Sequence, residues 1–239
     1  MLQPSDFEVI QAQASVFTPG LNLHTTRVLA ELLAVYADTF NGDPVTIPGV
    51  EGFPLEAPRL MLQSRDGKQR LQAGPSRLDL FQASFDAQGI LPLPQFLEWC
   101  LRLFDSYLAI TQGRVGRTAC VVTRRACADE PAREVATQFC KQALLDGPFV
   151  RPSDFEVHAG KQFDLADGIR VNGWFRCKSA LLIGPQGQRQ RAVTVEQDIN
   201  TTVEEAESRD FGQDDRRQFF GLVPGAFSRD MESHFPQLR

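Results

Sequence analysis

The sequence lacks the patterns that mark membrane, secreted and zinc-binding proteins. Among its 239 residues, no run approaches the roughly 18 consecutive apolar residues that a membrane-spanning helix requires. The N-terminus has no positive region followed by an apolar stretch, as a signal peptide would. Its 5 cysteines are an odd number without a CxxC pair, which argues against a disulfide framework or a zinc site. We therefore expect a cytoplasmic protein with reduced cysteines and no membrane association.

Motifs for catalysis and cofactor binding are also missing. The three histidines, His24, His158 and His234, lie far apart, and none belongs to an HExxH pattern. There is no GxSxG and no GK[ST], and Gly184-Pro-Gln-Gly falls in an expected hairpin turn. The sequence therefore predicts no cofactor, no metal and no catalytic residue, and it does not favour an enzyme.

The charge balance disfavours nucleic acid as a partner. The formal net charge is -5, whereas phosphate binding needs clustered lysine and arginine. Hydrophobic residues make up 42% and charged residues 23%, as in soluble globular proteins. The aromatic residues are 18 Phe against 2 Tyr and 2 Trp, and we expect most of these phenylalanines in the core.

The best-defined stretch is a strand, a helix and a strand over residues 77–85, 94–110 and 117–125. The helix is predicted from apolar residues spaced three and four apart, with Pro92 and Pro94 near its start. Gly113 is expected to end it in a left-handed turn. Residues 118–123 are β-branched and apolar, which is typical of a buried strand.

The remaining elements follow from alternation, turn residues and helical spacing. Residues 44–58 form a proline-rich loop, and Asp66-Gly67 predicts a hairpin turn. In the last helix, Gly221 and Pro224 are expected to cause a break or kink. Strands are expected over residues 7–17, 59–63, 69–73, 169–183 and 191–199. One helix is expected to begin at Thr25 or Thr26, another to span 130–145, and the last to begin at Asp214 or Asp215.

A six-residue repeat divides the chain. Pro-Ser-Asp-Phe-Glu-Val occurs at residues 4–9 and again at 152–157, each time before an expected strand. The repeat indicates either an internal duplication or the independent use of a good strand start. We predict an α+β fold of antiparallel sheets with helices on one face and two pseudo-similar halves. The halves are residues 1–147 and 148–239, or together one continuous domain.

Two groups of side chains are candidates for binding. Arg77, Arg117, Arg124 and Arg125 begin or end expected strands, where guanidinium groups could hold a carboxylate or phosphate. Salt bridges to neighbouring acidic residues are the alternative. On the strand over 169–183, Trp174 and Arg176 share one face with Lys178, a composition favoured at protein interfaces.

Three segments resemble a sporadically distributed prokaryotic family of unknown function. They are Gln-Ala-Gly-Pro-Ser-Arg-Leu at 72–78, the helix over 94–110, and the strand segment over 114–125. Members carry a VGPxRL strand, an amphipathic helix and a strand similar to RIGLRY. The third segment departs from this pattern because it lacks the tyrosine. The resemblance implies a cytoplasmic α+β protein and supplies no catalytic residue.

Three functional hypotheses follow. The first is a non-enzymatic interaction module that binds itself or a partner encoded nearby, as in an antiviral defence system. Exposed sheet edges are natural docking sites for such a module. The second is an enzyme or a small-anion or nucleotide-binding protein with an arginine-lined groove between the halves. This groove would be formed by Arg77, Arg117 and Arg124 with His158. A nucleic-acid-binding protein is the least favoured.

Overall fold

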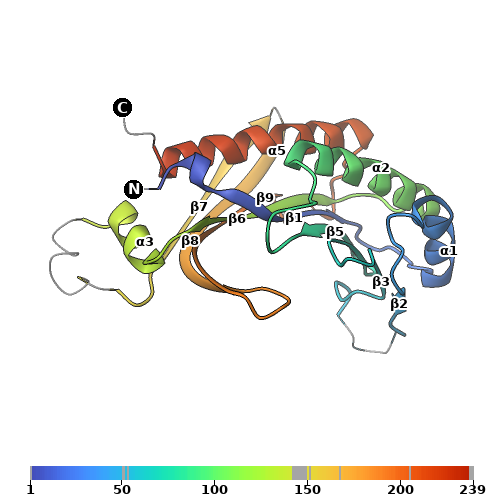
Figure 1. The fold of residues 1–239 in the computed structure, drawn as a ribbon. Coiled ribbons are helices and arrows are strands. Elements are labelled where there is room, and N and C mark those ends of the chain that lie inside the picture. Colours follow the sequence, from blue (N-terminus) through green and yellow to red (C-terminus); the bar gives the residue numbers. More distant parts are fainter. Residues whose placement is uncertain are drawn as a thin grey trace.

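A single antiparallel sheet of nine strands organises the computed structural model (Figure 1). The structure describes residues 2–49, 52, 54–141, 150, 152–166, 168–204 and 206–236. The strand order is β2-β3-β4-β5-β1-β6-β9-β8-β7. The strands are β1 (Glu8–Phe17), β2 (Val45–Thr46), β3 (Leu60–Gln63), β4 (Gln69–Ala73), β5 (Arg77–Ala83), β6 (Arg117–Cys127), β7 (Glu156–Ala166), β8 (Ile169–Ile183) and β9 (Arg189–Thr201).

The helices cover one face of this sheet, which confirms the predicted α+β class (Figure 1). They are α1 (Thr25–Tyr36), α2 (Leu93–Thr111), α3 (Pro131–Phe139) and α5 (Gln213–His234), and a 3-10 turn, η1 (Pro4–Asp6), precedes β1. Because β6 pairs with β9, the sheet runs without interruption across the expected boundary near residue 147.

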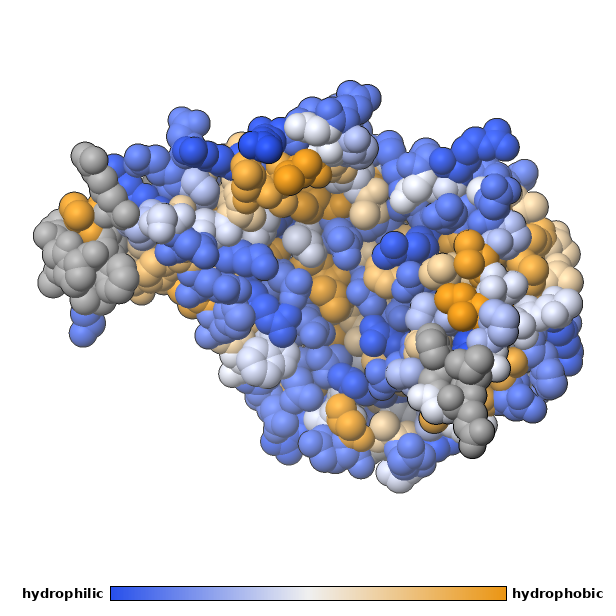
Figure 2. All heavy atoms as spheres, turned by 90° about the horizontal axis from the view of Figure 1, so that it is seen from below, coloured by the Kyte–Doolittle hydropathy of each residue, from blue (hydrophilic) through white to orange (hydrophobic). Residues whose placement is uncertain are grey.

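Side-chain alternation gives the sheet two different faces. In β1, Ala12, Ala14 and Val16 are fully buried beneath the helices, whereas Ser15 and Phe17 point to the opposite face. The period of two therefore separates an apolar face from a polar one. We call the face without helices the open face. Hydrophilic residues cover most of it (Figure 2).

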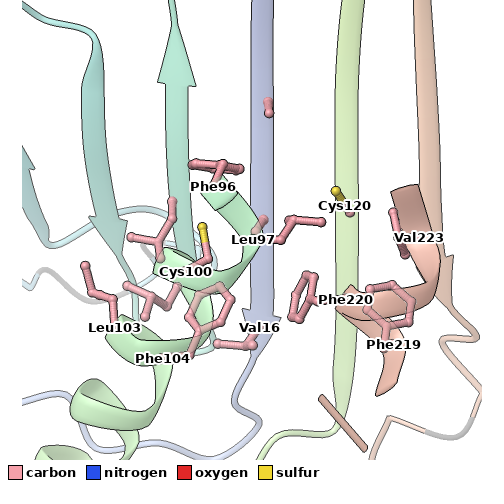
Figure 3. Close-up of a cluster of buried hydrophobic side chains, with 14 of the residues drawn as sticks. Val16, Phe96, Leu97, Cys100, Leu103, Phe104, Cys120, Phe219, Phe220 and Val223 are labelled. Atoms are coloured by element: carbon pink, nitrogen blue, oxygen red, sulfur yellow. The ribbon is translucent and has the colours of Figure 1, made fainter. Parts of the chain in front are cut away.

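The main core lies between the sheet and helices α2 and α5. Phe104 of α2 and Phe220 of α5 are fully buried, with ring centroids 5.7 Å apart, and both point toward β1 (Figure 3). At the polar margin of this interface, the Arg216 Nη2 donates to Asp105 Oδ1 at 2.8 Å. The helical spacing in residues 93–111 thus corresponds to a buried stripe, as predicted.

A second apolar cluster joins both copies of the repeat. Phe7 packs on Phe235 at the end of α5 with centroids 4.7 Å apart, and Phe155 packs against the same cluster. In each copy the following glutamate, Glu8 or Glu156, is the first residue of a strand. Both copies therefore supply a phenylalanine to one cluster and begin a strand, while an internal duplication stays a prediction.

Several expected helix ends were wrong. The expected break in α5 does not occur, since the helix continues through Pro224. Buried residues on both sides of the proline keep one face against the core, and such packing outweighs local propensity. Helix α2 ends with Gln112, not Gly113, in the left-handed region at φ 53. Helix α3 ends at Phe139, before the expected end at residue 145, and residues 142–145 lie outside the described residues. Helix α1 begins at Thr25, as expected, and its N-cap is His24.

Candidate functional site

Two of the predicted arginines meet on the open face. Phe17 lies in β1 between Arg77 of β5 and Arg117 of β6, which are its partners in the strand register. The guanidinium carbons lie 4.7 Å and 4.6 Å from the centroid of the Phe17 ring. Guanidinium groups at this distance from a ring gain cation–π attraction. The structure therefore brings Arg77 and Arg117 together around one aromatic ring.

Both arginines also bind other side chains or carbonyls of the chain. Arg77 Nε donates to Asp79 Oδ1 at 2.7 Å, and that carboxylate also accepts from Ser15 at 2.5 Å. Arg117 Nε donates to the Thr201 carbonyl at 2.9 Å, and its Nη2 donates to Asn200 Oδ1 at 2.7 Å. These bonds fix the strands β5, β1, β6 and β9 relative to one another.

The polar network continues across β9 to the second predicted surface. Asn200 Nδ2 donates to Asp198 Oδ1 at 3.0 Å. Burial raises the pKa of Asp198, although Arg176 and Arg117 oppose the shift. Arg176 pairs with Glu196, and its guanidinium carbon lies 5.8 Å from the Trp174 ring centroid. Positive and negative groups thus alternate along the open face, so it is not a basic surface.

Arg124 and Arg125 point to opposite faces, because they are neighbours in one strand. Arg125 is 5% exposed and binds Glu8 through Nε at 2.6 Å on the open face. Arg124 lies on the helix-covered face, where its Nε donates to Gln197 Oε1 at 3.2 Å. Burial lowers the pKa of Arg124. The arginines expected in one groove are therefore divided between the two faces. His158 lies on β7 next to Glu156, away from them.

Arg124 begins a chain of polar contacts that reaches α5. Gln197 is fully buried, and its Nε2 donates to Asp230 Oδ2 at 2.9 Å. The same carboxylate lies 3.5 Å from His234 Nδ1. The His234 ring stacks on Phe175 with centroids 3.7 Å apart and an interplanar angle of 4°. These contacts hold Asp230 and His234 in fixed positions above β8 and β9.

Asp230 and His234 form one wall of a cavity of about 410 Å³ between α5 and the edge strand β7. We call this cavity the edge groove. Its lining is mainly apolar, with polar groups from α5 at one side. It is lined by Ala159, Gly160, Lys161, Phe163, Gly173, Trp174, Phe175, Ile199, Ala226, Phe227, Arg229, Asp230, Ser233 and His234.

Two glycines let aromatic rings pack across the strands at this edge. A Cβ atom on Gly160 would lie 2.7 Å from the Trp174 ring, and one on Gly173 would lie 2.8 Å from the Phe163 ring. An aromatic side chain over a strand glycine replaces the missing packing. Trp174 is 44% exposed, so its indole forms a surface beside β7.

No model of a known protein family matches this chain, and no curated protein is similar to it. The resemblance to a sporadically distributed prokaryotic family therefore stays a prediction. Among the described residues, no helix is long and apolar enough to cross a membrane. In the same part of the chain, no three His, Cys, Asp or Glu side chains gather as metal ligands would.

Of the residues that line the edge groove, only Trp174 was predicted from the sequence as a binding residue. Phe227, Asp230 and His234 lie on one side of α5 because they are spaced three and four residues apart. That spacing was present in the sequence, but the break or kink expected at Gly221 and Pro224 concealed it. The approach of α5 to β7 depends on the strand order, which no local pattern indicates.

Proposed function

We propose that this chain is a protein-interaction module that binds an extended segment of a partner by adding a strand to β7. The observation that carries the proposal is the edge groove, in which an open strand edge and a side-chain cavity occur together. In strand addition, main-chain hydrogen bonds supply affinity and pockets for alternate side chains supply specificity.

The two edges of the sheet differ in a way that supports this choice. The edge strand β2 has only 2 residues, whereas β7 has 11 and is mostly exposed. Very short edge strands are a common protection against unwanted pairing. No described strand pairs with the outer side of β7, so its outward N–H and C=O groups can accept another chain. The exposed Trp174 lies beside the same edge on the open face, opposite Phe175, and adds the kind of aromatic surface that interfaces favour.

The test combines peptide selection with hydrogen exchange. Nine-residue peptides would be selected from a random library against the full chain, and amide exchange would be measured by mass spectrometry with and without the selected peptide. We expect slower exchange within residues 156–166, because an added strand covers the outward amides of β7. Protection confined to another surface, or no selected peptide, would refute strand addition.

A variant that fills the groove provides the specific control. Ala159 is exposed and lines the groove from β7, so Ala159→Trp should occupy the cavity and abolish peptide binding. Gln162 is exposed on the opposite face of the same strand, so Gln162→Trp should retain the groove. Equal binding by both variants would contradict the groove as the docking site.

A second candidate function is binding of a small anion or nucleotide on the open face. It is favoured by one observation: among the described residues, neither Arg77 nor Arg117 uses its Nη1 in a hydrogen bond. Burial also lowers the pKa of Arg117, and perturbed groups concentrate at functional sites. Titration calorimetry with phosphate and ATP tests this hypothesis, with Arg117→Gln as the variant that should lose the signal.

A further inference from the structure

The edge groove has features that restrict the chemistry of its partner. Its floor consists of the Phe163, Phe175 and Phe227 rings together with Ile199 and Ala226. A volume of about 410 Å³ lies at the lower end of the range for ligand pockets, roughly 300–1,000 Å³. Polar side chains lie only at its margins, with Lys161 on β7 and the others on α5. The floor therefore suits a single large apolar side chain.

The rim of the groove carries unpaired positive charge. Lys161 of β7 and Arg229 of α5 are both exposed, and neither forms an ion pair with any described residue. The Lys161 Nζ lies 5.3 Å from the Phe163 ring centroid, which keeps the ammonium at the margin of the apolar floor. The one carboxylate that lines the groove, Asp230, already accepts a hydrogen bond from Gln197. The groove thus has two cations against one carboxylate, in contrast with the net charge of -5 for the whole chain.

Strand geometry fixes where matching charges must lie in a partner. In an extended segment, residues two apart point to the same face. If an apolar side chain enters the groove at position i, the side chains at i-2 and i+2 point to the same side. Lys161 and Arg229 lie at the rim of the same cavity, so carboxylates that flank the apolar side chain on this side of the segment would lie close to positive charge.

We infer that the edge groove selects an extended acidic segment, in which a large apolar side chain has Asp or Glu two residues before and two residues after it. This inference rests on the proposed strand addition and specifies its partner. Electrostatic complementarity of this kind contributes mainly to specificity and association rate. The apolar anchor supplies the burial.

Defined peptides test the inference. The probe is fluorescein-labelled Ser-Thr-Glu-Thr-Phe-Thr-Glu-Thr-Ser-amide, compared with versions in which Phe is replaced by Ala or both Glu residues by Lys. Binding would be measured by fluorescence polarisation at 50 mM and 500 mM NaCl. We expect the Glu peptide to bind about tenfold more tightly than the Lys peptide at low salt, since two exposed ion pairs each contribute modestly. The preference should shrink at high salt because of screening. Replacing Phe by Ala should weaken binding at least about tenfold.

Charge-reversal variants identify the responsible cations. The double variant Lys161→Glu with Arg229→Glu should reverse the preference and bind the Lys peptide more tightly. Lys178→Glu is the matched control, because Lys178 is an exposed cation on the neighbouring strand β8 but faces the opposite side of the sheet. It should leave the preference unchanged. Lys161→Gln, a milder change, should reduce the preference if the double variant does not fold.

The outcomes separate this inference from the proposed function. Equal binding of the Glu and Lys peptides with protection of residues 156–166 would overturn the acidic partner but keep strand addition. A failure of all peptides to bind would overturn both, as would protection confined to the open face. Protection of β7 that rises with protein concentration, together with a dimer in native mass spectrometry, would identify a second copy as the occupant and refute the inference.

Discussion

The contact between Phe104 and Phe220 predicts that the two halves of the chain unfold together. Phe104 belongs to α2 in the first half and Phe220 to α5 in the second, and each is at most 1% exposed. Replacing a buried phenylalanine by alanine costs about 3–5 kcal/mol, through lost burial and the cavity that remains. With a urea m-value of about 3 kcal/mol/M, Phe104→Ala should lower the urea midpoint by roughly 1–1.7 M.

The two tryptophans allow this prediction to be measured separately in each half. Trp99 lies on α2 and Trp174 on β8, and the chain has no others. Trp99→Phe and Trp174→Phe leave one fluorescent probe each. In both backgrounds, Phe104→Ala should lower the urea midpoint equally, as expected of one cooperative unit. A shift seen by Trp99 but not by Trp174 would refute the reasoning and favour two domains, residues 1–147 and 148–239.

Three further predictions concern single positions. Gly116→Ala would place its Cβ 2.0 Å from a backbone carbonyl oxygen and should lower the free energy of unfolding by about 1–3 kcal/mol. Gly221→Ala has open space around it and should raise the free energy of unfolding by about 0.5–1 kcal/mol. Urea titration measures both changes. Burial raises the pKa of Asp198, so the folded state binds its proton more tightly and stability falls as pH rises from 3.8 through the folded pKa. Asp198→Asn should remove this loss and be more stable than the unchanged protein at pH 7. Melting temperatures of the variant across pH 3–8 that match those of the unchanged protein would contradict this. Glu8→Ala removes the carboxylate that pairs with Arg125, which is 5% exposed. The free energy of unfolding, measured by urea titration, should fall by about 1–2 kcal/mol. The loss is smaller than for a fully buried pair because the Glu8 side chain is 45% exposed.

Local patterns predicted the elements whose faces differ most in polarity. Helix α2 and strand β8 were predicted within one or two residues, because one side of each is continuously apolar or alternates strictly. The prediction that Trp174 and Arg176 lie on the opposite face of β8 from Phe175 was confirmed, because side chains alternate strictly along this strand. The helical ends were less predictable, since packing of residues distant in sequence decides whether a helix continues past a proline.

The candidate site was only partly predictable because it depends on pairing across the chain. Arg77 and Arg117 meet at Phe17 only because β1 lies between β5 and β6, and nothing near Phe17 in sequence indicates that insertion. Arg124 was expected in the same groove, but its strand position directs it to the other face. The edge groove requires β7 at the end of the sheet and α5 above it. These are consequences of topology, which residue patterns constrain only weakly.

The central position of β1 and the late position of α5 have a consequence for synthesis of the protein. Strand β1 is made first, but its partners β5 and β6 begin about 70 and 110 residues later. Both apolar clusters are then completed by α5 and Phe235. The part of the apolar face that α5 covers therefore stays exposed until residues 213–235 have been synthesised, and during that interval it is prone to aggregation. Chains interrupted before α5 should need chaperones to remain in solution.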